Sequence, residues 1–241
     1  MQATPSPKNV EAGIYDSSYC FVFAPRESWH GVKWEEEALR CKAGAIIFAQ
    51  DDRADAAFLI EEGLIKLTRL EEDGQEIITG VAAHGMLPGY TAVLLNTRYA
   101  ATAKTLNQCV LRRIEATKFR SLIQNDLQFS WRFHQWHCRL MYQSTAQRVA
   151  LQALSARQRV ELFLWELVSL LMPNENSSQV KLALPLKHWE MAYLIGITPE
   201  HFSRLLHDLK KDDLIIRDRE GLVFTNPSRL WHQTEYFRSF S

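Results

Sequence analysis

Between residues 38 and 114, short apolar runs of strand length alternate with turn residues. We predict β-strands at residues 45–48, 56–60, 64–70, 77–81, 100–105 and 109–114. Asp73-Gly74 separates the third strand from the fourth, and an Asp-Gly pair between two such runs is a strong signal for a β-hairpin. Many short strands at this spacing predict a β-sandwich or a barrel.

From residue 116 onward the apolar positions follow a helical period. We predict helices at residues 116–125, 126–154 and 157–172, because this region contains neither Gly nor Pro, the two helix breakers. The middle helix would be about 43 Å long, which is more than one small domain needs. One stripe repeats at steps of three and four and is apolar except for polar residues in its middle: Phe133, Trp136/His137, Leu140, Ser144, Gln147, Leu151 and Leu154. We favour a seam that pairs with a second copy of the helix. A stripe packed on the core of its own chain is the alternative.

Residues 186–224 predict a helix, a tight turn, a second helix and a hairpin. The first helix covers residues 186–194, and Gly196 supplies the positive φ that the turn needs. The second helix covers residues 198–211, with Thr198 as its N-cap and Pro199 at its first position. Strands at 214–216 and 222–224 would form a two-stranded wing. This order of elements is that of a winged helix-turn-helix, whose second helix enters the major groove of DNA.

Three polar residues of the second helix have the chemistry of base recognition. Glu200, Ser203 and Arg204 lie at i, i+3 and i+4 and share one helix face. Arg can donate two hydrogen bonds to guanine, Glu can accept from cytosine N4, and Ser can contact either kind of base. The core side of the helix would be formed by Phe202, Leu205, Leu206 and Leu209. We also predict DNA contacts by residues at or near helix starts, which are Thr198, His201 and Lys187.

Composition adds little to this interpretation. Hydrophobic residues make up 46% of the 241 residues and charged residues 23%, as in a globular protein of one or two domains. Lys plus Arg number 28, as do Asp plus Glu, so net charge gives no argument for nucleic acid. No apolar run approaches the ~20 residues of a membrane span, and the N-terminus lacks a secretory signal. We therefore expect a cytoplasmic protein with no membrane partner and four free thiols, at Cys20, Cys41, Cys109 and Cys138.

Several segments, in order, resemble the Crp/Fnr superfamily of bacterial transcription regulators. Residues 44–48, 58–67 and 73–76 are similar to the β-roll of that family, and residues 159–164 to the helix that opens its DNA-binding domain. The segment Thr-Pro-Glu-His-Phe-Ser-Arg-Leu-Leu at 198–206 is similar to its recognition helix. The full order of these segments, with the recognition helix, is a specific signal.

The resemblance implies an α+β fold with three parts: an N-terminal β-roll like the cyclic-nucleotide-binding jelly roll, a long dimerisation helix and a C-terminal winged helix-turn-helix. We place an N-terminal arm at residues 1–30, the β-roll at 31–125, the dimerisation helix at 126–154 and the DNA-binding domain at 155–241. The last domain includes a C-terminal tail that we expect to pack on the protein through Leu230, Trp231, Tyr236 and Phe237.

The resemblance also implies partners. These are a second copy of the chain, double-stranded DNA with a palindromic operator, and RNA polymerase. The Glu-x-x-Ser-Arg pattern is similar to that of the Fnr-like branch, whose half-sites are TTGAT-like. An effector-gated sensor, with haem, a gas or an unusual small molecule in or near the β-roll, is the alternative.

Members of the family that bind cyclic nucleotides hold the phosphate with a short segment, the phosphate cassette, which corresponds to residues 89–102 of this chain. The residues of this segment do not favour a cyclic nucleotide. Tyr90 stands where nucleotide-binding members have Glu, and Tyr99-Ala100 or Ala100-Ala101 where they have Arg-Ser. A phosphate would lose its bidentate donor. Arg98 would have to act from a shifted strand position, which re-aims its side chain. We therefore expect no standard cyclic AMP binding and assign no effector site.

We expect no cofactor, no metal and no enzymatic activity. Cys20 and Cys41 are too far apart for an iron–sulfur site, which needs closely spaced thiolates. The residues that a haem would draw on are His84, His134, His137 and Cys138, and they form no haem motif. The sequence also lacks a phosphate loop, paired metal ligands and a nucleophile–base set.

Overall fold

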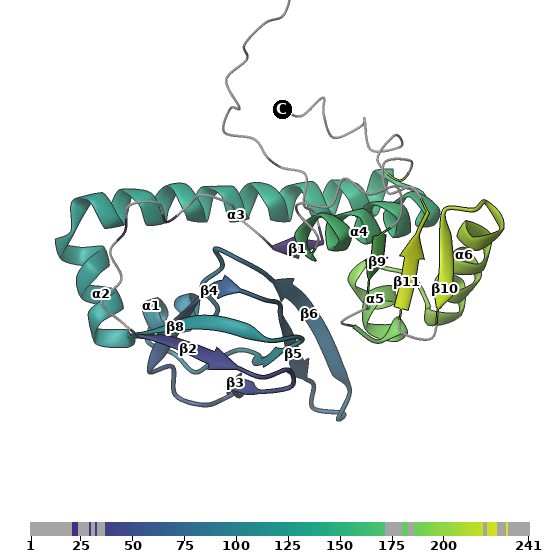
Figure 1. The fold of residues 1–241 in the computed structure, drawn as a ribbon. Helices are drawn as coiled ribbons and strands as arrows, with labels where there is room; N and C mark the ends of the chain where they lie inside the picture. The colour runs from purple at the N-terminus through teal and green to yellow at the C-terminus, as the bar shows by residue number, and fades with distance from the viewer. Residues whose placement is uncertain are drawn as a thin grey trace, which may run out of the picture.

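The structure is a computed structural model, and it describes residues 21–23, 29, 32, 37–171, 180–182, 186–218, 221–225 and 230. Figure 1 shows the long helix α3 (Leu127–Ala153) running along one side of the molecule. In this view the strands between residues 38 and 115 lie below its N-terminal half and its middle, and helices α5 (His188–Leu194) and α6 (Pro199–Lys211) lie below and beyond its C-terminal end. Among the described helices, none combines the length and the apolar composition that a membrane crossing requires.

Two sheets form the β-roll. One has the strand order β1-β6-β5-β7-β3 and the other β2-β8-β4. The strands are β1 (Val22–Phe23), β2 (Ala38–Cys41), β3 (Ile46–Phe48), β4 (Ala56–Glu62), β5 (Ile65–Leu70), β6 (Glu76–Ala82), β7 (Thr102–Thr105) and β8 (Cys109–Glu115). The six predicted strands are all present, and β5 and β6 pair antiparallel as the Asp73-Gly74 turn predicts. The sequence analysis missed β1, β2 and the short helix α1 (Tyr90–Leu95).

Three helices follow the β-roll, and they closely match the predicted bounds. They are α2 (Ala116–Asn125), α3, and α4 (Ala156–Leu171). Asp126 caps α3 by accepting a hydrogen bond from the Phe129 N–H at 3.0 Å. The apolar residues of α4 that point to the core, Val160, Phe163, Leu164, Leu167 and Val168, are all buried. The side chain of Leu171, the last residue of α4, lies outside the described residues.

The predicted seam of α3 is wrong as a surface for a second subunit. Phe133, Trp136 and Leu140 are buried in the core of the β-roll, and Leu154 is buried with residues of α4, α5 and α6. The other members, His137, Ser144, Gln147 and Leu151, are half-buried. This stripe therefore packs on the chain's own domains, which was the alternative interpretation, because each half of α3 has a domain beneath it.

The unit that the sequence predicts to bind DNA, called the DNA-binding unit below, contains α4, α5 (His188–Leu194), α6 (Pro199–Lys211) and a small sheet. The predicted two-stranded wing is too small. β10 (Ile215–Asp218) and β11 (Gly221–Phe224) are joined by β9 (Val180–Leu182), and the sheet order is β10-β11-β9. Residues 173–178, which precede β9, are polar and predict only a loop, and the sequence gives no separate signal for this three-residue strand.

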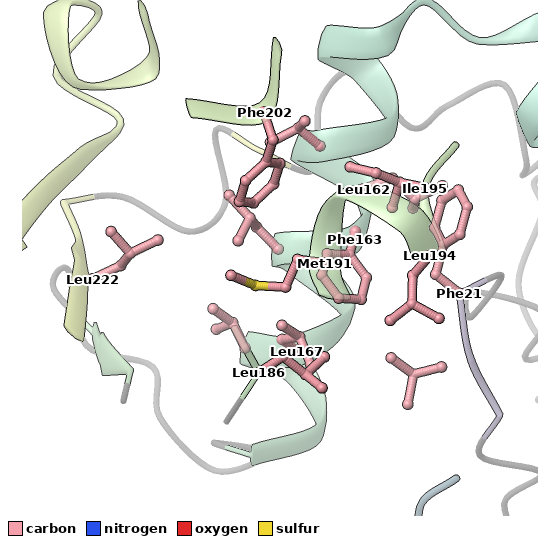
Figure 2. Packing of buried hydrophobic residues seen from close by; sticks show 14 of the residues in the cluster. Phe21, Leu162, Phe163, Leu167, Leu186, Met191, Leu194, Ile195, Phe202 and Leu222 are labelled. Carbon is pink, nitrogen blue, oxygen red and sulfur yellow. The ribbon is translucent and has the colours of Figure 1, made fainter. Parts of the chain in front are cut away.

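The β-roll and the DNA-binding unit share one apolar cluster. It combines Leu64, Ile78 and Val81 of the β-roll region with residues of α4, α5 and α6. Figure 2 shows Phe21 beside Leu194 and Ile195, with Phe163 and Met191 further into the same cluster. The two parts therefore form one continuous core rather than two domains joined only by a linker.

Part of the expected N-terminal arm is ordered structure. Val22 and Phe23 pair in parallel with Val81 and Ala82 of β6, and Phe21 packs edge-on against Phe163. The buried Glu166 carboxylate accepts hydrogen bonds from the Phe21 and Val22 N–H groups at 2.9 and 3.1 Å. The rest of the arm, except Trp29, lies outside the described residues. In the expected tail, Leu230 is fully buried, while Trp231, Tyr236 and Phe237 lie outside the described residues.

Candidate DNA-binding surface

The turn before α6 is fixed by contacts with the end of α3. Gly196 has φ +67, as the sequence predicts, and its carbonyl accepts a hydrogen bond from Arg159. The same guanidinium donates to the carbonyls of Leu151 and Leu154 at 2.8 and 3.3 Å. One arginine thus joins the last turn of the long helix to the turn of the helix-turn-helix. This contact sets the start of α6 relative to α3.

Helix α6 is amphipathic, and its apolar face is buried. Phe202, Leu205, Leu206 and Leu209 are all buried, as predicted. Thr198 accepts a hydrogen bond from the His201 N–H at 3.2 Å and so caps the helix, and Pro199 opens it. The four anchoring residues fix the rotation of α6 about its axis, so the opposite face is held toward solvent.

The exposed face carries the three residues predicted to read bases. Glu200, Ser203 and Arg204 are all exposed, and within the described part of the chain the side chains of Ser203 and Arg204 have no hydrogen-bond partner. Hydrogen bonds from its own backbone N–H and from the Thr198 hydroxyl, with the nearby Arg204 charge, lower the pKa of the Glu200 carboxyl. Glu200 is therefore an ionised acceptor at neutral pH, as pairing with cytosine N4 requires.

The remaining predicted contacts lie near the starts of the two helices. Thr198 is exposed and His201 half-buried at the start of α6. Lys187 is exposed at the N-cap of α5, and its ammonium lies 6.0 Å from the centre of the Trp189 ring. The wing also carries Arg217 and Arg219, but Arg219 and the side chain of Arg217 lie outside the described residues.

The sequence analysis missed a concavity beside the recognition helix. It lies between α6, the start of α5 and the wing, with a volume of about 210 Å³. Its lining is His188, Ser203, Leu206, His207, Lys210, Ile215 and Leu222. His207 and Lys210 stand three and six residues after Arg204. This spacing could have shown that the two residues lie on the same side of α6 as Arg204. It could not have predicted the concavity, because the wing strands form part of its lining.

The interior of the β-roll at the expected phosphate cassette is filled by aromatic rings. Tyr99 is buried and stacks on Phe48, with ring centres 4.0 Å apart. Its hydroxyl donates to the Ala56 carbonyl and accepts from the Ala56 N–H. Burial raises the pKa of Tyr99, so this hydroxyl stays protonated at neutral pH. Gly89 fits beside it only because it lacks a side chain, since a Cβ there would come within 2.9 Å of Tyr99.

Arg98 and Tyr90, the two cassette residues that could have contacted a nucleotide, make contacts within the protein instead. Arg98 is exposed and donates to the Asp51 carbonyl at 2.6 Å, so it is held at the surface. Tyr90 contacts the rings of Phe133, Trp136 and His137 on α3. Tyr90 therefore ties the cassette to the long helix.

The four residues considered for a haem are spread over the surface and α3. His84 contacts the Glu61 carbonyl and His134 the Ser130 carbonyl, each at 2.7 Å. His137 lies among the aromatic rings, and Cys138 is exposed. Within the described residues, no group of three His, Cys, Asp or Glu side chains is placed to hold a metal ion. Cys41, Cys109 and Cys138 are free thiols, and Cys20 lies outside the described residues.

Two family matches cover most of the chain. Residues 38–126 match the Cyclic nucleotide-binding domain family, and residues 158–232 match the Crp-like helix-turn-helix domain family. The first match concerns the fold of the β-roll, whose cassette residues differ as described above.

Curated relatives are similar over most of their length. The Transcriptional activatory protein AadR of Rhodopseudomonas palustris is 26% identical over 76% of this chain and 75% of its own. The Nitrogen fixation regulation protein FixK of Bradyrhizobium diazoefficiens is 24% identical over 78% of both chains.

Solved structures show the same fold. FixK2 from Bradyrhizobium japonicum has a TM-score of 0.65 at 18% identity and covers 83% of this chain and 97% of its own. TTHB099 from Thermus thermophilus, a transcriptional regulator of the CRP family, has a TM-score of 0.67 at 21% identity over 82% and 96% of the two chains. With the β-roll, the long helix and the winged helix-turn-helix in this order, the chain belongs to the Crp/Fnr superfamily of transcription regulators.

Proposed function

We propose that this regulator binds a palindromic operator as a homodimer, with α6 of each protomer in the major groove. The observation that carries the proposal is the arrangement of α6. Its apolar face is buried in the DNA-binding unit, and Glu200, Ser203 and Arg204 share the exposed face. An α-helix with its side chains is about 10–12 Å across and fits the ~12 Å major groove.

Each polar residue of α6 has a distinct role in this proposal. Arg204 donates to guanine O6 and N7, Glu200 accepts from cytosine N4, and Ser203 contacts an adjacent base. Thr198, His201 and Lys187 contact the sugar–phosphate backbone from the helix starts. The likeness of the Glu-x-x-Ser-Arg pattern to the Fnr-like branch supports TTGAT-like half-sites.

We place the dimer contact on a second stripe of α3, which we call the exposed stripe. It consists of Leu127, Trp131, His134, Cys138, Met141 and Thr145, all exposed and spaced by alternating steps of four and three. This is the heptad spacing of a helix that pairs with a parallel copy. Trp131 is 65% exposed and Met141 62%, large apolar surfaces that a second helix would cover.

We propose that this β-roll takes no cyclic nucleotide at the usual phosphate position. The stacked rings of Tyr99 and Phe48, with the Tyr99 hydroxyl bonded to Ala56, support this proposal. A nucleotide phosphate there would meet an aromatic ring in place of a guanidinium. The effector is left unassigned.

The remaining parts of the proposal follow from the family. The DNA-bound dimer contacts RNA polymerase, the protein acts in the cytoplasm, and it regulates transcription without catalysing a reaction. Membership of the Crp/Fnr superfamily supports these statements.

The test of base recognition is the Arg204→Ala variant. We expect it to bind a duplex with a TTGAT-like inverted repeat more weakly, by ~1–3 kcal/mol per half-site, and to lose preference for the contacted guanine. Arg204→Lys is the matched control, because it keeps the charge but not the two-pronged donor. The Arg204→Lys variant should keep its affinity for random duplexes and still lose the preference for guanine. If Arg204→Ala bound with unchanged affinity and base preference, α6 would not be reading the operator through this residue.

A further inference from the structure

The concavity beside α6 has an apolar floor and a polar rim. Leu206, Ile215 and Leu222 form the floor, and each is nearly fully buried. Ser203, His207 and Lys210 of α6 stand on the rim and are exposed, with His188 of α5 across from them. His188 is itself held edge-on against the buried Phe202 ring, with ring centres 5.8 Å apart. The wall on the α5 side is thus anchored in the core.

The charge of the rim favours an anion. Lys210 is cationic, and the imidazole of His207 supplies an N–H donor. Among the described residues that line the concavity none is acidic, and Asp208 lies on the exposed part of the same helix. Within the described part of the chain, Lys210 and His207 form no ion pair or side-chain hydrogen bond. Their donors are therefore available to a ligand.

The concavity is continuous with the surface that reads bases. Ser203 belongs to both, and His207 follows Arg204 by one turn of α6. A helix seated in the major groove nearly fills its width, so the side of the helix facing the wing lies against one sugar–phosphate strand. The apolar floor suits a deoxyribose and the rim suits its phosphate.

We infer that the concavity holds one sugar–phosphate unit of the operator strand that borders the major groove, with Lys210 and His207 contacting the phosphate. The inference rests on the proposed function, since it requires α6 to lie in the groove. Lys210 and His207 fix the register of α6 on the duplex and carry no base preference of their own.

The first experiment measures operator affinity of the full-length protein at several salt concentrations. Lys210→Ala should lower the slope of log affinity against log salt by about 0.9 per protomer, equally on operator and random duplexes. Its guanine preference should be unchanged. Lys211→Ala is the matched control, because Lys211 is the next residue of α6, is exposed, and does not line the concavity. An equal change in the Lys211 variant would mean that general charge alone is measured, and would overturn the inference.

The second experiment locates the phosphate. Duplexes carrying one neutral methylphosphonate at each position of a half-site are bound to the parent protein, to Lys210→Ala and to Lys211→Ala. We expect one position where neutralisation weakens the parent and Lys211→Ala but has no further effect on Lys210→Ala. Identical losses in all three proteins at every position would contradict the inference. If the parent binds none of the duplexes, the proposed function itself fails, which is a distinct outcome.

Discussion

At the scale of single residues, Gly196 shows how backbone geometry positions helix α6. It lies in the left-handed region, and an added Cβ would come within 3.0 Å of Leu151 on α3. A side chain there would strain both the turn and its contact with the long helix. The turn thus constrains its residue twice, through φ and through packing.

We therefore expect Gly196→Ala to lower the free energy of unfolding by more than the left-handed backbone alone costs, which is about 1–2 kcal/mol. The matched control is Gly74→Ala, because Gly74 has φ +84 but nothing within 4 Å of an added Cβ. Urea unfolding of both variants isolates the packing contribution. Equal losses would show that the contact with Leu151 does not constrain the turn.

Sequence reasoning works well for residues such as Gly196 and Thr198, whose roles follow from local geometry. It identified the glycine turn, the N-cap and the exposed face of α6. Tyr99 is different. Its position in the sequence shows that the usual cassette arginine is missing. The sequence does not show that the Tyr99 ring stacks on Phe48, 51 positions away, or that its hydroxyl hydrogen-bonds to Ala56, 43 positions away. Such contacts depend on how distant strands meet.

At the scale of elements, α3 has two stripes with steps of three and four. The steps of three and four from Phe133 to Leu154 predict the stripe through Phe133 and Leu140 as the seam. That stripe packs on the β-roll and the DNA-binding unit of the same chain. Periodicity gives the faces of a helix but not which neighbour covers each face. The exposed stripe, with Trp131 and Met141, is the surface that we propose a second subunit covers.

The exposed stripe predicts a specific cross-link. In a parallel pair related by a two-fold axis, the same seam position of each helix faces its copy, so Cys138 should face the partner's Cys138. We expect a short bifunctional maleimide to give a covalent dimer on a denaturing gel. Cys138→Ser should abolish the product while sedimentation still reports a dimer. A dimer in solution whose parent chain gives no Cys138-dependent product would place the contact elsewhere.

At the scale of the whole molecule, a buried ion pair joins the β-roll to the DNA-binding unit. Lys66 of β5 pairs with Glu190 of α5, whose side chain is only 2% exposed. The other oxygen of Glu190 accepts from the Lys187 N–H at 2.8 Å and so caps α5. Lys66 and Glu190 are 124 residues apart in the chain, and no local pattern predicts their contact. The order of the two units was predictable from the sequence, but their docking was not.

We expect Lys66→Met to destabilise the protein by about 3 kcal/mol, because it leaves the Glu190 carboxylate buried without its cation. Lys104→Met is the control, since Lys104 is the partner of Lys66 in the neighbouring strand β7. Combining Lys66→Met with Glu190→Gln should recover part of the loss, because the amide carries no charge. Thermal and urea unfolding give the free energy of unfolding of the two lysine variants and of the double variant. Equal losses for the two lysine variants would mean that the pair does not hold the units together.

We propose that two copies of α6, related by a two-fold axis, read one duplex. This arrangement is tested by selecting operators from random duplexes with the full-length protein. We predict enriched sequences with an inverted repeat, TTGAT-like half-sites and half-site centres ~34 Å apart along the helix axis. Enrichment of a single site without two-fold symmetry, or no enrichment at any salt concentration, would contradict the claim.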